Sequence, residues 1–264
     1  MIVFAAITPH PPVLIPTIGK ENVEKIKSTK QALENLAKKL EILKPERIII
    51  ISGHGSVLKD KFSVFSQEKY EADFNEFGDF SSKLEFSPDF EFIAKLKSAS
   101  RLQGLNIIVK AEKLDYGSAI PLNFLLNTED TKKIKVVAIT HSFLPIESHY
   151  KFGQIIGSEI LKLGKRTAII ASGDLSHKLL PDSPAGYWDK AIEFDKNFID
   201  LLAKNDHEKF LKFNKKNIEN AAECLYYTQG IMLGLLKGQN IKFNMHSYEY
   251  PFGVGYLVAD YDFI

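Results

Sequence analysis

Short runs of β-branched and other apolar residues recur along the chain, each bounded by polar or turn-forming residues. The runs are Ile2–Thr8, Arg47–Ser52, Asn106–Val109, Lys135–Thr140, Arg166–Ser172 and Val254–Tyr261. Continuous apolar runs of this length are typical of strands that are buried on both faces of a sheet. We therefore predict six strands.

Between these runs, apolar residues recur at the three- and four-residue spacing of a helix with one buried face. This spacing predicts helices over about 23–43, 152–163, 191–202 and 218–236. The alternation predicts an α/β fold: a single domain over residues 1–264, with a mostly parallel or mixed central sheet and helices on both faces. Residues 56–100 are only weakly periodic, and we interpret them as an excursion from the sheet.

Composition and charge exclude several classes of protein. The chain is 45% hydrophobic and 25% charged, which is ordinary for a globular protein, and its net charge of +1 gives no global field to attract nucleic acid or an anionic membrane. The apolar start at residues 1–7 has no basic segment before it, and no run approaches the length of a membrane span. We expect a cytoplasmic protein. The single cysteine, Cys224, excludes an internal disulfide framework and a cysteine-based zinc finger.

Four of the seven histidines follow the carboxyl end of a predicted strand. They are His10, His54, His141 and His177, and glycines or prolines flank the first two. In open α/β sheets this edge carries the ligand site. A lone histidine at a strand end is usually structural, but four at one edge favour a metal cleft there. For the other three, we expect His149 at the surface near a helix cap, His207 in a solvated loop and His246 in a structural role.

Glu223 stands in an apolar stretch of the last predicted helix. A carboxylate in such a place needs a lysine partner, hydrogen bonds or a metal, because an isolated buried charge is costly. Two histidines and one carboxylate form the facial triad of non-heme Fe(II) oxygenases, and His10, His54 and Glu223 fit that set. The same donors suit Zn(II), so ligand type leaves the choice of metal open.

Motifs across nearly the whole chain resemble those of the class III extradiol ring-cleavage dioxygenases, the LigB-like catalytic subunits. The similarity is greater to the LigB-like domains of the AmmeMemoRadiSam group, which are related to Memo proteins. The matching segments are residues 9–12, 53–55, 115–117, 120–122, 172–177, 223–224 and 250–256. Their joint order and spacing, rather than any single motif, carry the resemblance.

The resemblance implies that His10, His54 and Glu223 hold Fe(II) and that His177 is the catalytic histidine, with Asp174 beside it. It implies that a catechol-type aromatic and O2 are the substrates, and that the protein forms a homodimer. Histidine suits proton transfer because its unperturbed pKa is near 6.5.

Departures from the family pattern keep other functions open. Tyr116 stands where many members have histidine, while Memo proteins keep the fold and are not established ring-cleavage enzymes. The alternatives are a Memo-like metal-binding protein with a redox, regulatory or maturation role and, more remotely, a zinc-dependent hydrolase. Close relatives carry a tyrosine where this chain has His141. We therefore predict that Tyr116 and His141 have exchanged places. Two arrangements are open: both side chains face the metal cleft, or His141 only caps its strand and hydrogen-bonds to a loop.

Overall fold

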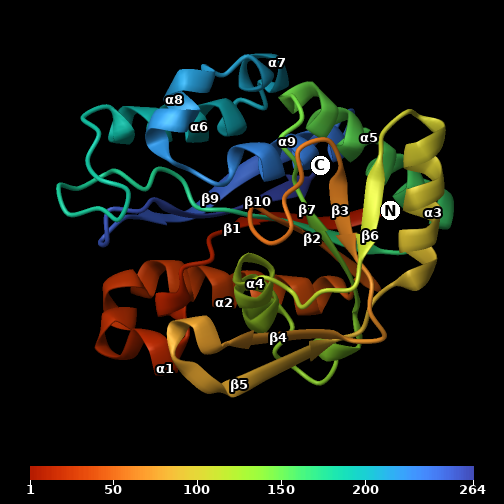
Figure 1. Ribbon diagram of the computed structural model, residues 1–264, viewed down its shortest axis with the longest axis horizontal. Coiled ribbons are helices and arrows are strands. Elements are labelled where there is room, and N and C mark those ends of the chain that lie inside the picture. The colour runs from red at the N-terminus through yellow and green to blue at the C-terminus, as the bar shows by residue number, and fades with distance from the viewer.

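A central eight-stranded sheet organises the molecule, and the computed structural model describes all of residues 1–264 (Figure 1). The strand order is β6-β3-β7-β2-β8-β1-β10-β9. The strands are β1 (Ile2–Thr8), β2 (Arg47–Ser52), β3 (Phe62–Phe65), β6 (Ile107–Lys110), β7 (Lys135–Thr140), β8 (Thr167–Ser172), β9 (Ile241–Glu249) and β10 (Tyr256–Phe263). A separate hairpin pairs β4 (Tyr70–Phe74) with β5 (Asp79–Phe86).

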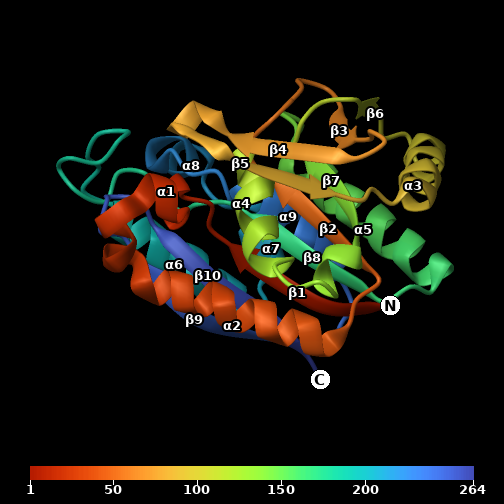
Figure 2. The same ribbon diagram turned by 90° about the horizontal axis from the view of Figure 1, so that it is seen from below.

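Helices cover both faces of this sheet (Figures 1 and 2). They are α1 (Pro16–Gly19), α2 (Lys27–Leu43), α3 (Phe90–Leu102), α4 (Tyr116–Leu125), α5 (Ile146–Leu163), α6 (Ala191–Ala203), α7 (His207–Leu211), α8 (Lys215–Ala221) and α9 (Tyr226–Leu235). One apolar cluster joins the sheet to α3, α5, α6 and α9, and the other joins it to α2, α4 and the β4–β5 hairpin. The predicted α/β class, mixed sheet and two-sided helical cover are confirmed.

The four central strands, β7, β2, β8 and β1, are parallel neighbours. Nearly every residue in them is buried, which explains why they lack the alternation of a half-exposed strand. Their registers align Thr8, Ser52, Thr140 and Ser172 at one edge of the sheet. The chain ends lie at the opposite edge, because β10 runs antiparallel to β1 and finishes beside its start.

Two predictions about the elements are wrong. The helix expected over 218–236 is two helices, α8 and α9, because Ala222 takes a left-handed backbone conformation (φ 54°) that ends the first of them. The weakly periodic segment 56–100 is not wholly an excursion, since β3 within it joins the main sheet between β6 and β7. No helix is long and apolar enough to span a bilayer. The expected cytoplasmic location and homodimer stay predictions.

Candidate metal centre at the carboxyl edge of the sheet

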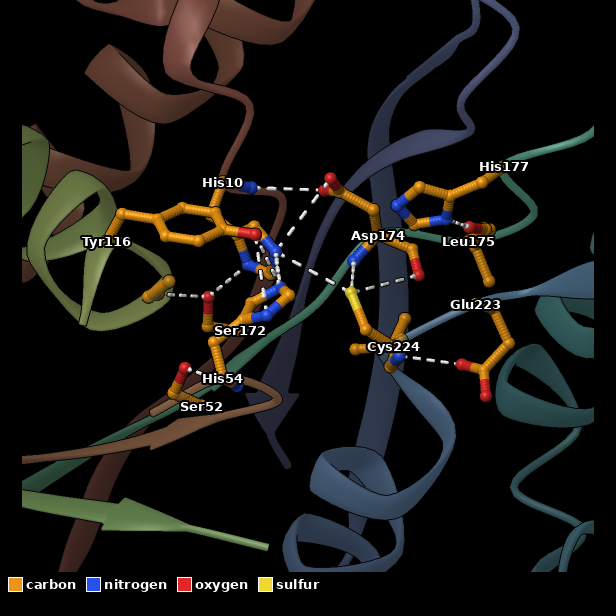
Figure 3. A network of polar contacts seen from close by, with 12 residues as sticks. His10, Ser52, His54, Tyr116, Ser172, Asp174, Leu175, His177, Glu223 and Cys224 are labelled. Atoms are coloured by element: carbon orange, nitrogen blue, oxygen red, sulfur yellow. Dashed lines mark hydrogen bonds and ion pairs between the residues drawn. The ribbon is translucent and has the colours of Figure 1, made fainter. Parts of the chain in front are cut away.

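Parallel pairing brings the predicted site segments to one place. Because Thr8, Ser52 and Ser172 lie level in β1, β2 and β8, the turns that follow them carry His10, His54 and Asp174 to the same edge (Figure 3). This is the edge at which open α/β sheets bind ligands. The expectation that these strand-end residues gather there agrees with the structure.

His10 is held in one orientation by Ser172. The Ser172 hydroxyl donates to the Gly117 carbonyl at 2.5 Å, so its oxygen accepts a hydrogen bond from the His10 Nδ1–H, 2.9 Å away. The proton on Nδ1 leaves Nε2 with a lone pair. A hydrogen bond of this kind is typical of metal-binding histidines, since it fixes both the tautomer and the angle of the ring.

The Nε2 atoms of His10 and His54 lie 2.9 Å apart, with the two rings edge to face. Burial lowers the pKa of His10 to about 3; burial and the neighbouring His10 lower that of His54 to about 4. Both imidazoles are therefore neutral at pH 7, the state in which histidine binds a metal. The two neutral nitrogens could therefore serve as two ligands of one metal ion.

Cys224 completes the group that the structure brings together. Its Sγ lies 3.5 Å from Nε2 of His10, and one ligand atom from each of His10, His54 and Cys224 falls within 4.8 Å of the others. The sulfur also accepts a hydrogen bond from the Asp174 amide at 3.1 Å. Burial raises the pKa of the thiol well above its usual value, so a bound cation would have to drive its deprotonation. Two imidazoles and a thiolate suit transition metals, zinc among them.

Glu223 is not brought to the two histidines. It lies in the turn between α8 and α9, not within a helix, and its Oε2 accepts hydrogen bonds of 2.6 Å from the amides of Leu225 and Tyr226 at the start of α9. Figure 3 shows its carboxylate on the far side of Cys224 from His10 and His54. Burial raises its pKa to about 8. The cost of burial is met by backbone amides rather than by the lysine partner considered above.

Gly53 allows the His54 turn to lie against the Cys224 turn. A Cβ atom at this position would come within 2.5 Å of the Cys224 carbonyl oxygen, which is part of the backbone and cannot move aside easily. Glycine at position 53 thus permits the close approach that places Cys224 beside the histidine pair.

Tyr116 lies at the first turn of α4, whose N-cap is Asp115. Its hydroxyl is 3.1 Å from Nε2 of His54, and burial raises its pKa, so it stays a neutral phenol. Asp115 also accepts a hydrogen bond from Ser52, whose hydroxyl oxygen in turn accepts one from the His54 amide. The helix cap and the His54 turn therefore share one hydrogen-bonded network.

His177 and Asp174 line a small cavity of about 170 Å³ beside His10 and Tyr116. The Nδ1–H of His177 donates to the Leu175 carbonyl at 3.0 Å, which leaves Nε2 free to accept a proton. The buried Asp174 accepts a hydrogen bond from the His10 amide through Oδ1 at 3.1 Å. His177 thus lies beside the group of His10, His54 and Cys224 and is not part of it.

The structure does not bring Tyr116 and His141 together. The rings next to Tyr116 are those of His10, His54 and Phe77, whereas His141 stacks on Tyr227. The ring nitrogens of His141 lie 2.9 and 3.2 Å from the carbonyl oxygens of Ser142 and Gly53. The proposed exchange of the two residues has no support in these contacts.

The remaining histidines are structural. His149 is fully buried in α5, where its Nδ1–H donates to the Pro145 carbonyl, so the expected surface position is wrong. His207 begins α7 and contacts the Tyr150 hydroxyl at 3.1 Å rather than lying in a solvated loop. His246 lies in β9, and its Nε2 is 3.0 Å from the carboxylate of Asp260, in agreement with the structural role expected of it.

Asp195 was not singled out from the sequence, although it supports the His177 segment. From α6 it accepts hydrogen bonds from the Ser176 amide (3.0 Å) and the Tyr248 hydroxyl (2.7 Å), and burial raises its pKa to about 7. The folded state therefore binds this proton more tightly than the unfolded chain. Stability is lost as the pH rises toward 7.

We expect Asp195→Asn to remove this pH dependence. Between pH 5 and pH 8 the carboxyl of Asp195 should cost the wild-type protein roughly 2–3 kcal/mol of unfolding free energy, and the amide should cost nothing. Urea unfolding of both proteins at the two pH values measures the difference. An equal loss of stability in both would show that other groups cause it.

The chain is similar to proteins of one known family. Residues 4–259 match the family described as the catalytic LigB subunit of aromatic ring-opening dioxygenase. The protein CA_C1420 of Clostridium acetobutylicum is 31% identical over 260 residues, 95% of this chain. A 3,4-dihydroxyphenylacetate 2,3-dioxygenase of Escherichia coli is 31% identical over 145 residues, 52% of this chain.

The chain spans about half the length of these curated relatives, 55% and 49% respectively. Among solved structures, an uncharacterized Escherichia coli K12 protein, JW3007, has the same fold, with a TM-score of 0.66 at 15% identity over 98% of this chain and 99% of that one. The family match covers nearly every residue, including all the strand-end segments that build the site. The chain belongs to the LigB family, which includes extradiol dioxygenases.

Proposed function

We propose that this protein is a metal-dependent oxidoreductase that opens the ring of a small catechol-type aromatic with O2. The observation that carries the proposal is the convergence of the His10 and His54 Nε2 atoms, 2.9 Å apart, beside a cavity lined by Tyr116, Asp174 and His177. Membership of the LigB family supports the class of reaction.

Fe(II) is the proposed metal, held by His10 and His54; when bound, it supplies the redox chemistry that O2 requires and that Zn(II) lacks. Ser172 keeps the lone pair of His10 directed at the metal position. The neutral phenol of Tyr116 can donate a hydrogen bond to an oxygen of the substrate once a metal engages His54.

His177 is the proposed acid/base. Its free Nε2 can take a proton from a catechol hydroxyl in the cavity and later return it, and the Leu175 carbonyl holds the ring in the tautomer that makes this possible. Asp174 lies between His177 and His10 and lines the same cavity. Val254 and Tyr256, both buried, also line the cavity.

For the third ligand, the sequence favours Glu223 and the geometry favours Cys224. We expect Cys224→Ser to lower the affinity for the metal roughly 100-fold, since it removes the sulfur that contacts His10. Glu223→Ala should keep the metal and cost about 1–2 kcal/mol of unfolding free energy, because α9 loses the acceptor for two of its first amides. Metal content by mass spectrometry, with urea unfolding alongside, gives both results. If Glu223→Ala loses the metal and Cys224→Ser keeps it, the carboxylate is the ligand.

Activity is tested by anaerobic purification, loading with Fe(II) and exposure to a panel of catechols in air. Ring opening consumes one O2 per catechol and gives yellow products, so oxygen uptake and absorbance must rise together. The protein loaded with Zn(II) is the matched control, since it has the same fold without a redox metal. Iron-loaded protein that takes up no oxygen with any catechol would contradict the proposal.

A second candidate function is a Memo-like metal-binding protein with a redox, regulatory or maturation role. The thiol of Cys224 favours it, because thiolate ligands select softer metals than the carboxylate of a facial triad does. A zinc-dependent hydrolase is a weaker alternative based on the same donors. Preferential retention of copper or zinc over iron, together with no oxygen uptake, would support these two alternatives over ring opening.

A further inference from the structure

The candidate cavity is lined by one carboxylate and by no lysine or arginine. Its lining includes His10, Tyr116, Asp174, His177, Val254 and Tyr256, and the remaining two lining residues are prolines. Asp174 is thus its only carboxylate, and no lysine or arginine contributes to the wall.

Asp174 has an oxygen available to a ligand. The residue is 5% exposed, and its Oδ1 accepts the His10 amide. Its Oδ2 accepts no hydrogen bond within the chain, and Nε2 of the uncharged His10 lies 3.8 Å from it. Because Asp174 lines the cavity, a donor group of a bound ligand could reach this oxygen.

Other charges around the site have the same sign. Apart from other histidines and Cys224, the charged groups that shift the pKa values of His10, His54 and Tyr116 are carboxylates. They belong to Asp115, Asp174 and Glu76. Two lysines lie on bordering segments: Lys178 follows His177, and Lys25 places its Nζ 5.6 Å from the centre of the Phe252 ring. Neither lysine lines the cavity.

We propose that this cavity selects catechols by charge: it accepts those whose ring substituent is uncharged or cationic and rejects those that carry a carboxylate. The proposal rests on the proposed function. A carboxylate on the ring would enter without a lysine or arginine to pair with it and would face Asp174, and burying an unpaired charge is costly. An ammonium or hydroxyl group could instead donate to Oδ2 of Asp174. The selectivity would differ from that of the relative whose printed substrate, 3,4-dihydroxyphenylacetate, carries a carboxylate.

The test compares three catechols that share a two-carbon substituent and differ in its charge: 4-ethylcatechol, 4-(2-aminoethyl)catechol and 3,4-dihydroxyphenylacetate. Binding to the metal-loaded protein without oxygen is measured by calorimetry. We expect the anion to bind at least about tenfold more weakly than the other two. Asp174→Asn should narrow the difference in affinity between the cationic and the anionic catechol. Lys25→Met should leave that difference unchanged.

A gain-of-function pair sharpens the test. Pro12 lines the cavity at the first position of a short helical turn, and Pro16 takes the same position in α1 but does not line it. Pro12→Arg should improve binding of the anion relative to the neutral catechol, whereas Pro16→Arg should not. Equal affinity for all three catechols, or preference for the anion in the wild-type protein, would overturn the proposal.

Oxygen uptake with the same three compounds separates this proposal from the proposed function. The expected order of binding without oxygen uptake would preserve the charge selectivity and contradict ring opening. Oxygen uptake with tighter binding of the anion would support ring opening and contradict the charge selectivity. Failure of all three to bind would contradict both.

Discussion

His54→Ala should lower the affinity of the protein for a divalent transition metal by more than about 100-fold, while the fold persists. The ring lies half-buried in a turn, and its principal polar partners are His10 and Tyr116, so its removal leaves the sheet and both apolar clusters in place. Ser172→Ala should have a smaller effect, about 10–100-fold, because it frees the tautomer of His10 without removing a ligand. Metal titration of the purified wild-type protein and of the two variants gives the three affinities.

The control for this prediction is His246→Ala. That histidine is exposed in β9 and pairs with Asp260, away from the carboxyl edge of the central strands. Its loss should not change metal binding. If His54→Ala binds the metal as tightly as the wild-type protein, the histidine pair is not the metal centre.

His177→Ala should retain the metal and lower turnover of a catechol by about 10²–10⁴-fold, the usual contribution of a positioned acid/base. The reason is geometric: the side chain lines the cavity and is bonded to the backbone of its own loop rather than to the ligand group. Steady-state oxygen uptake and metal content, measured on the same preparation, test both parts.

His207→Ala is the matched control for His177→Ala. The His207 ring, at the start of α7, is also half-buried, but it contacts Tyr150 of α5. Turnover should therefore not change. Loss of the metal in His177→Ala would show that His177 is a ligand. Unchanged turnover would show that another group moves the proton.

The central strands were predictable because burial on both faces leaves a continuous apolar run in the sequence. The predicted bounds of β1, β2 and β7 agree with the structure. The strand β9 was missed because it lies at the edge of the sheet, where exposed and half-buried residues alternate without a clear period. Helix α4 was missed for the opposite reason: it is buried almost all round, so it shows no apolar stripe.

The third position of the metal site could not be fixed from sequence. Glu223 and Cys224 are adjacent in a turn, where the direction of a side chain depends on local backbone angles that no periodic pattern encodes. The left-handed conformation of Ala222 ends α8 just before them. Apolar residues recur at helical spacing across this break, at Ile218, Ala221 and Leu225, so they gave the pattern of one continuous helix. The histidines were easier to place, because strand ends in a parallel sheet share one edge.

The position of the chain ends has a practical consequence. Both ends lie at the amino edge of β1, where the Thr167 amide donates to the Met1 carbonyl and the Ile264 amide donates to that of Asn240. A strand of seven residues separates this edge from the metal centre by roughly 20 Å. An affinity tag or a fluorescent reporter fused to either end would therefore stay clear of the cavity mouth. Immobilising the protein through those ends on a sensor surface would leave the candidate cavity facing the solution.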